Sequence, residues 1–164
     1  IGYQTGCGIM AGSPYQTTAH IAEDLEFMHS LQPEMVGIGP FIPHHDTPFK
    51  DRPAGTLRQT LLLLSIVRLM LPDVLLPATT ALGTIEPDGR EQGVMAGANV
   101  VMPNLSPLEV RKKYMLYDNK ISTGVEAAAN IKELKRRMAS IGYEVVTDRG
   151  DHKKIKSVPA LKTS

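Results

Sequence analysis

The sequence has few of the features that assign a function directly, and cysteine is the scarcest of them. Its 164 residues include a single cysteine, Cys7. One thiol excludes an internal disulfide framework, and it excludes any metal cluster held by three or four thiolates of this chain alone. The chain must therefore be stabilised by a packed core, for which its length is sufficient.

The chain also lacks an excess of charge and a long apolar run. Lys and Arg number 18 against 17 for Asp and Glu, so no strong field would attract nucleic acid or an anionic membrane. The most apolar stretch, "LLLLSIVRLML", contains Arg68 and ends before Pro72, well short of the roughly 20 residues that span a bilayer. We expect a cytoplasmic protein that has no nucleic-acid or membrane partner.

The first residues, "IGYQTG", include neither an initiator Met nor the basic and apolar regions of a secretory signal. We therefore expect the chain to begin inside a longer protein. The composition, with 42% hydrophobic and 21% charged residues, is that of a globular domain.

Apolar runs and periodicity predict strands that alternate with helices. Thr residues precede the first two helices as N-caps, and prolines or glycines follow several elements. The predicted strands cover residues 5 to 12, 35 to 42, 74 to 82 and 99 to 104; the predicted helices cover 18 to 31, 56 to 71, 89 to 97, 107 to 116 and 125 to 141. Beyond Asp148 we expect a polar, basic and frayed end.

Strands that alternate with helices indicate parallel βα units. An open doubly wound sheet and part of a (β/α)8 barrel both satisfy this order. A whole barrel needs about 250 residues, and the chain begins without a start signal. We therefore predict an α/β fold: the carboxyl-terminal half of a (β/α)8 TIM-type barrel, with four parallel βα units and a C-terminal helix, in residues 1 to 150. Residues 151 to 164 form a polar basic tail.

In either architecture ligands bind at the carboxyl ends of the strands. The residues found there are Ile9 to Gly12 with Ser13, Pro40 to Asp46, the pair Thr79 and Thr80, and Met102 to Asn104. Hydroxyls, a Met, an amide and bare glycine backbone suit a small polar ligand. Structural roles are open as well: the glycines can serve close strand packing and the threonines local hydrogen bonds, while Met102 taken alone is more typical of the core.

The stretch "PHHDTP" raises the question of a metal site. Neighbouring His side chains diverge in an extended chain, so His44 and His45 would need a special turn to hold one ion. We expect instead a loop shaped by its prolines, with Asp46 bonded to backbone two residues on, and no metal site. Phosphate-loop and G-x-S-x-G motifs are absent, and no residue is predicted to be catalytic.

Three motifs resemble one family in order and spacing: "GIGPFIPHHDTPF", "PATTALGTIEPDGRE" and "GANVVMPNLSP". They are similar to the carboxyl-terminal half of the HydE-type maturases of FeFe-hydrogenase, which are radical S-adenosylmethionine enzymes related to biotin synthase and methylornithine synthase. The resemblance implies a (β/α)8 barrel that binds S-adenosylmethionine and a 4Fe-4S cluster, whose C-x-x-x-C-x-x-C ligands belong to the amino-terminal half. It implies 5′-deoxyadenosyl radical chemistry on a small iron-bearing or amino-acid-like substrate, and other hydrogenase maturases as partners.

The resemblance also implies site residues at matching positions. Those near S-adenosylmethionine are Gly8, Met10, Gly12 and Ile42, and those lining the substrate cavity are Met35, Thr79, Thr80, Met102 and Tyr117. A dry cavity with few polar groups protects a radical and orients a substrate.

The chain departs from the family pattern in its cysteines. The cluster motif is absent, and the region "KISTGVEAAAN", where some relatives hold a second cluster, has none. We expect the full-length protein to be an enzyme and this chain alone to be inactive. The alternatives are a biotin synthase-like or methylornithine synthase-like enzyme, or a non-catalytic half-barrel module for binding or assembly.

Overall fold

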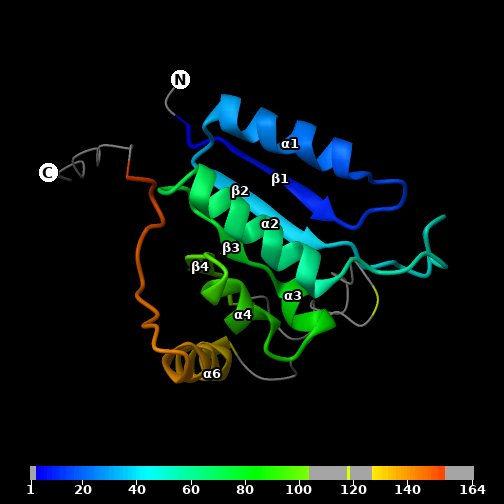
Figure 1. Cartoon of the computed structure of the whole chain (residues 1–164). Coiled ribbons are helices and arrows are strands. Elements are labelled where there is room, and N and C mark those ends of the chain that lie inside the picture. The colour runs from blue at the N-terminus through cyan, green and yellow to red at the C-terminus, as the bar shows by residue number, and fades with distance from the viewer. Residues whose placement is uncertain (1–2, 104–117, 119–126, 154–164) are drawn as a thin grey trace, which may run out of the picture.

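The computed structural model describes residues 3 to 103, residue 118 and residues 127 to 153. Strands alternate with helices in this part of the chain (Figure 1). In chain order the elements are β1 (Gly6–Ala11), α1 (Thr18–Leu31), β2 (Met35–Pro40), α2 (Leu57–Met70), β3 (Pro77–Ala78), α3 (Thr80–Ile85), α4 (Gly89–Met95), β4 (Val100–Val101) and α6 (Ala127–Ser140). The helical turns expected over residues 107 to 116 lie outside the described residues.

The strands are parallel, as the sequence predicted. β1 pairs with β2 over six residues, β3 pairs with β4 over two, and one bridge between Met35 and Leu75 joins the two sheets. This arrangement is compatible with part of a (β/α)8 barrel, but the described residues form two small sheets and not four complete βα units in one sheet.

The predicted strand over residues 74 to 82 is wrong in its second half. β3 ends at Ala78, and α3 begins at Thr80 with Leu82 fully buried. Thr79 takes the extended backbone conformation of an N-cap residue, with φ −70° and ψ 158°. The threonine pair therefore marks a strand-to-helix junction, which apolar periodicity alone did not reveal.

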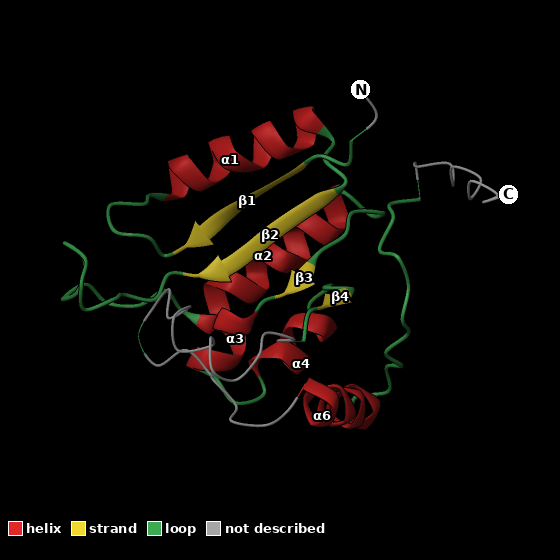
Figure 2. Cartoon of the chain, turned by 180° about the vertical axis from the view of Figure 1, so that it is seen from behind, coloured by secondary structure: helices red, strands yellow, loops and turns green. Residues whose placement is uncertain are grey.

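Only one face of the β1–β2 sheet is fully covered. Val36 and Ile38 are fully buried in a core built with side chains of α1 and α2. The opposite face contains Met35, Gly37 and Gly39, which are only half-buried, and no described helix lies in front of it in Figure 2. Within the described residues, this face of β2 therefore has no covering helix.

The predicted N-caps are confirmed, because Thr17 and Thr56 accept hydrogen bonds from backbone N–H groups at the starts of α1 and α2. At the end of α2, exposure does not follow polarity. Leu69 is 81% exposed, whereas Arg68 is half-buried and donates to three backbone carbonyls. Arg68 thus joins the end of α2 to the segments around it.

The carboxyl-terminal helix α6 packs on α4 through a second core. Leu134 and Met138 are buried with Val94, and Arg137 forms an ion pair with Glu91, which is 7% exposed. The prediction of a helix over residues 125 to 141 is confirmed in its described part, which agrees with the apolar periodicity. None of the described helices is long and apolar enough to cross a bilayer.

The segment after α6 returns along the amino ends of the strands (Figure 1, orange). His152 is 3% exposed, and its backbone N–H donates to the Gln4 Oε1 at 2.9 Å. Lys153 Nζ lies 2.9 Å from an Asp73 carboxylate oxygen. Fraying beyond Asp148 is therefore wrong for residues up to 153, because long-range contacts order them.

Candidate functional site

Four residues form a row across the carboxyl ends of the parallel strands. Met10 pairs with Gly39 in the register of β1 and β2. Thr79 and Met102 each directly follow the last paired residues of β3 and β4. The Thr79 Oγ1 lies 3.1 Å from the position that a Cβ on Gly39 would occupy, which puts β3 level with β2.

This row lies on the open face of the sheet. Met10 and Met102 are each 53% exposed. Gly39 has no side chain, and no heavy atom lies within 4 Å of the place where a Cβ on Gly37 would stand. The result is a surface with bare backbone in the middle and flexible apolar side chains at the sides, which suits a flat organic ligand.

The Thr79 hydroxyl is the most unusual polar group of this surface. Its oxygen is buried, and the described part of the chain offers it no hydrogen-bond partner. A buried hydroxyl without a partner costs about 1–3 kcal/mol, and such groups in native proteins call for an explanation. A polar group of a bound ligand would supply the missing hydrogen bond.

Arg90, on α4, adds a positive charge beside Thr80. Its Nη2 donates to the Thr80 Oγ1 at 3.0 Å and lies 3.5 Å from the Met102 carbonyl oxygen. Because Thr80 accepts from Arg90, its own hydroxyl proton is available to donate to another group. The sequence reasoning missed Arg90, although it lies inside the motif "PATTALGTIEPDGRE".

Gly8 and Gly12 have structural reasons to be glycine. A Cβ on Gly8 would lie 2.2 Å from the Gly37 carbonyl oxygen, so β1 and β2 approach too closely for a side chain there. Gly12 has φ +77°, and a Cβ on it would lie 2.6 Å from the Gly55 Cα. Contact of either glycine with a cofactor stays a prediction.

The other predicted site residues are more scattered. Ile42 is half-buried just beyond β2. Met35 shares the open face but begins β2, four residues before Gly39, so it lies about 13 Å away along the strand. The structure therefore does not bring Met35 together with Thr79. Tyr117 lies outside the described residues.

The loop after β2 has a different geometry from the one predicted. The rings of His44 and His45 stack with centroids 4.3 Å apart. The Asp46 backbone N–H donates to the His44 Nδ1 at 3.1 Å, while the Asp46 carboxylate lies 3.3 Å from the His45 Nε2. The expected bond from the Asp46 side chain to backbone two residues on is not among the described contacts.

His45 also contacts a residue far along the chain. Its Nδ1 lies 2.7 Å from the Asp118 Oδ1. The hydrogen bond with Asp118, helped by the Asp46 charge, raises the pKa of His45. The same hydrogen bond lowers the pKa of Asp118. The pair therefore favours an imidazolium facing a carboxylate.

Cys7 does not fit an iron–sulfur cluster at this site. Its side chain packs against the core on the helix-covered side of β1, away from the open face. Burial raises the pKa of the Cys7 thiol, whereas the ligand of a metal is the thiolate. Cys7 is therefore not a suitable cluster ligand.

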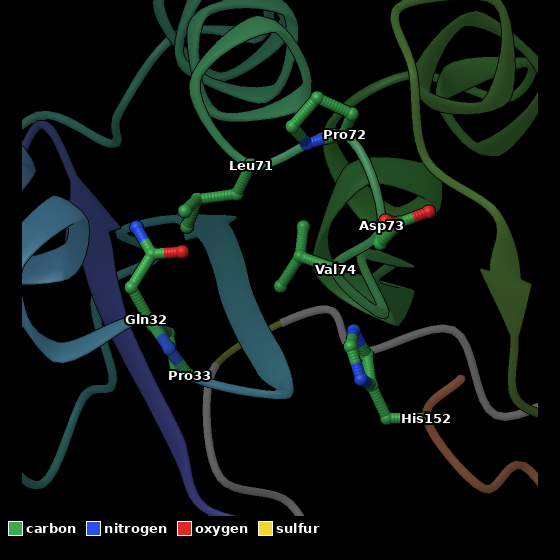
Figure 3. Close-up of a pocket in the computed structure, with 7 residues that line it drawn as sticks. All are labelled: Gln32, Pro33, Leu71, Pro72, Asp73, Val74 and His152. Atoms are coloured by element: carbon green, nitrogen blue, oxygen red, sulfur yellow. The ribbon is translucent and has the colours of Figure 1, made fainter. Parts of the chain in front are cut away.

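A small pocket at the amino ends of the strands is a separate feature (Figure 3). Its lining residues are Gln32, Pro33, Leu71, Pro72, Asp73, Val74 and His152. None of the predicted site residues contributes to it. The pocket lies where His152, from the segment after α6, packs beside the turn after α2, and we assign it no role in binding or catalysis.

Comparison with known proteins tests the resemblance seen in the three sequence motifs. No family model matches the chain. The chain is 42% identical over 155 residues to the [FeFe] hydrogenase maturase subunit HydE of Thermotoga maritima, which covers 94% of this chain and 44% of that protein. It is 30% identical over 143 residues to 3-methylornithine synthase of Methanosarcina barkeri, 87% of this chain and 39% of that protein.

The 3-methylornithine synthase of Methanosarcina acetivorans gives a similar result, with 31% identity over 146 residues. The chain spans less than half the length of these curated relatives. The matched region nevertheless includes nearly all of the chain, and with it the strands and strand ends described above. The resemblance predicted from the three sequence motifs is therefore confirmed, and the chain is similar in sequence to part of HydE over nearly all of its own length.

Proposed function

We propose that the protein containing this chain is a radical S-adenosylmethionine enzyme that acts in assembly of the FeFe-hydrogenase di-iron cofactor. The 42% identity to HydE over 94% of the chain is the observation that carries this proposal. The other hydrogenase maturases would be its partners, and the cytoplasm its setting. The chain itself would supply one wall of the reaction cavity and would be inactive alone.

The open face of the sheet gives this proposal a physical basis. When bound, S-adenosylmethionine together with a 4Fe-4S cluster supplies a 5′-deoxyadenosyl radical. The glycine backbone around Gly8 and Gly39 allows an adenosyl group to approach the sheet closely, with Met10 beside it. Gly12 and Ile42 would complete this side of the site.

The strand ends of β3 and β4 would hold the substrate. The Thr79 hydroxyl, buried without a partner in the described structure, would bond a polar atom of the substrate. The Thr80 hydroxyl, which accepts from Arg90, would donate its proton to a substrate acceptor. Met102 would shield the cavity from water, and the resemblance assigns Met35 and Tyr117 to the same cavity lining.

An assay of hydrogenase maturation by the full-length protein tests the role of Thr79. The Thr79→Val change removes the hydroxyl and keeps the volume. We expect maturation to fall by about tenfold or more, the scale of a lost hydrogen bond to a charged or polar substrate. Stability should be unchanged or slightly raised, because the hydroxyl lacks a partner in the folded protein.

The matched control is Thr18→Val, the same change at an exposed position on α1. It should leave maturation unchanged. If Thr79→Val supports normal maturation, the assignment of the Thr79 hydroxyl to substrate binding is wrong. If the unmodified protein supports no maturation at all, the proposed function is wrong.

A second candidate is an enzyme that makes an amino acid, as the name 3-methylornithine synthase indicates for two relatives. Arg90 beside Thr80 would suit the carboxylate of such a substrate. Biotin synthase-like chemistry and a non-catalytic half-barrel module are further options. Expression of the full-length protein in a strain that lacks its own hydrogenase maturase tests the first proposal, and recovery of hydrogenase activity would support it. If the protein is produced in soluble form but hydrogenase activity does not return, these other functions are favoured.

A further inference from the structure

The loop after β2 brings two adjacent imidazoles together. The Thr47 backbone N–H and hydroxyl both bond the His44 carbonyl, at 3.0 and 2.8 Å, and so close a tight turn. This turn stacks the His44 and His45 rings at 4.3 Å with 22° between their planes. The two side chains therefore point the same way, whereas in an extended strand they would diverge.

A carboxylate from a distant part of the sequence completes the group. The Asp118 backbone N–H donates to the Pro43 carbonyl at 3.1 Å, and the Asp118 Oδ1 lies 2.7 Å from the His45 Nδ1. Backbone and side chain thus hold Asp118 against the loop independently. One ligand atom from each of His44, His45 and Asp118 lies within 4.8 Å of the others.

We propose that His44, His45 and Asp118 bind a divalent first-row transition-metal ion. Two imidazoles and one carboxylate on one side of an ion, with water on the other, is a ligand set typical of such metals. Neighbouring ligands of a six-coordinate ion with bonds of roughly 2.1 Å lie about 3 Å apart. The 2.7 Å contact between His45 and Asp118 is close to that separation, and rotation of the His44 ring brings in the third ligand.

The three proposed ligands can give up their present hydrogen bonds when an ion binds. His44 gives up the hydrogen bond that its Nδ1 accepts from the Asp46 N–H. The proton between His45 and Asp118 leaves when the ion enters. The Asp46 carboxylate, 3.3 Å from the His45 Nε2, adds a second negative charge beside the site. Together with Asp118 it balances the two positive charges of the ion.

The ion would fasten the loop after β2 to Asp118, which follows β4 in the sequence. The loop and Asp118 lie on the carboxyl-terminal side of the strands, where the candidate site lies. This inference is independent of the proposed function, since it depends only on the three side chains and the turn that groups them. It reverses the expectation, drawn from the sequence, that the loop carries no metal site.

Calorimetric titration with Ni²⁺ and Zn²⁺ tests the site in tag-free protein that has been treated with a chelator. We expect one ion per chain, released protons, and binding weakened about tenfold or more in His45→Gln and Asp118→Asn. Because the His45 side chain is 68% exposed, its substitution should leave the far-UV circular dichroism spectrum unchanged. The control His29→Gln, on the exposed side of α1, should bind as the unmodified protein does.

Either of two results would overturn the proposal. One is no uptake of either ion at millimolar concentration. The other is uptake that persists at full strength in both His45→Gln and Asp118→Asn, which would show that the ions bind elsewhere on the surface.

Discussion

Arg68 is expected to be a main stabilising contact of the fold, and its replacement by Met tests this. The guanidinium donates to the carbonyls of Gly97 at 2.7 Å, Pro72 at 2.7 Å and Val74 at 3.0 Å. These acceptors belong to two segments, the turn directly after α2 and the loop after α4. Met keeps the apolar stem, which packs over Gly97, and removes only the donors.

The size of the effect follows from these contacts. Hydrogen bonds from a charged donor contribute about 1.5–3 kcal/mol each. The bond to Pro72 is exposed, so water replaces it at little cost. The bonds to Gly97 and Val74 are partly buried, which puts them at the lower end of the range. Burial also lowers the pKa of Arg68, but the group stays charged. We expect Arg68→Met to lower the free energy of unfolding by about 2–3 kcal/mol.

Urea denaturation followed by circular dichroism measures this loss. The control Arg58→Met lies on the same helix at an exposed position and should change stability by less than about 0.5 kcal/mol. Arg68→Lys should fall between the two, because an ammonium cannot reach three carbonyls in a fixed fork. Equal stability of the Arg68 and Arg58 variants would refute the reasoning.

Two further predictions concern ion pairs and pH. Arg137→Met leaves the carboxylate of Glu91, a residue that is 7% exposed, without its ion-pair partner. Urea denaturation should show a loss of about 2–3 kcal/mol in the free energy of unfolding, since water reaches part of the pair. The exposed control Arg136→Met should cost less than about 0.5 kcal/mol, and equal losses in the two variants would contradict a stabilising role of the Arg137–Glu91 pair. Two hydrogen bonds from Thr5, each 2.7 Å, lower the pKa of Glu34. That stabilisation is complete above the unfolded pKa of about 4.3 and disappears as pH falls through the folded value, so Glu34→Gln should destabilise at pH 7 more than at pH 3; an equal loss at both would sink the idea.

Local sequence patterns were sufficient for most helices and for the direction of the strands. Thr17 and Thr56 cap α1 and α2 as expected, because a cap needs only a side chain and an N–H three residues on. The candidate residues Met10, Thr79 and Met102 do line up at the carboxyl ends of parallel strands.

Other parts of the site depended on contacts between distant residues. No local pattern indicated that Arg90 on α4 would donate to Thr80, or that Asp118 would contact His45 across 73 residues of sequence. The change from strand to helix at Thr79 was not predicted, because the small and apolar residues of the segment 74 to 82 are compatible with either conformation.

By itself, then, the sequence determined a parallel α/β chain with its unusual residues at the strand ends, and its motifs determined the resemblance to HydE. Apolar periodicity and capping are local properties, and they were enough for this. Only the tertiary structure decided which face of the sheet is open, which hydroxyl is buried without a partner, and which side chains meet His45. These depend on strand register and on loop paths, through which residues far apart in the sequence come within a few ångströms of each other.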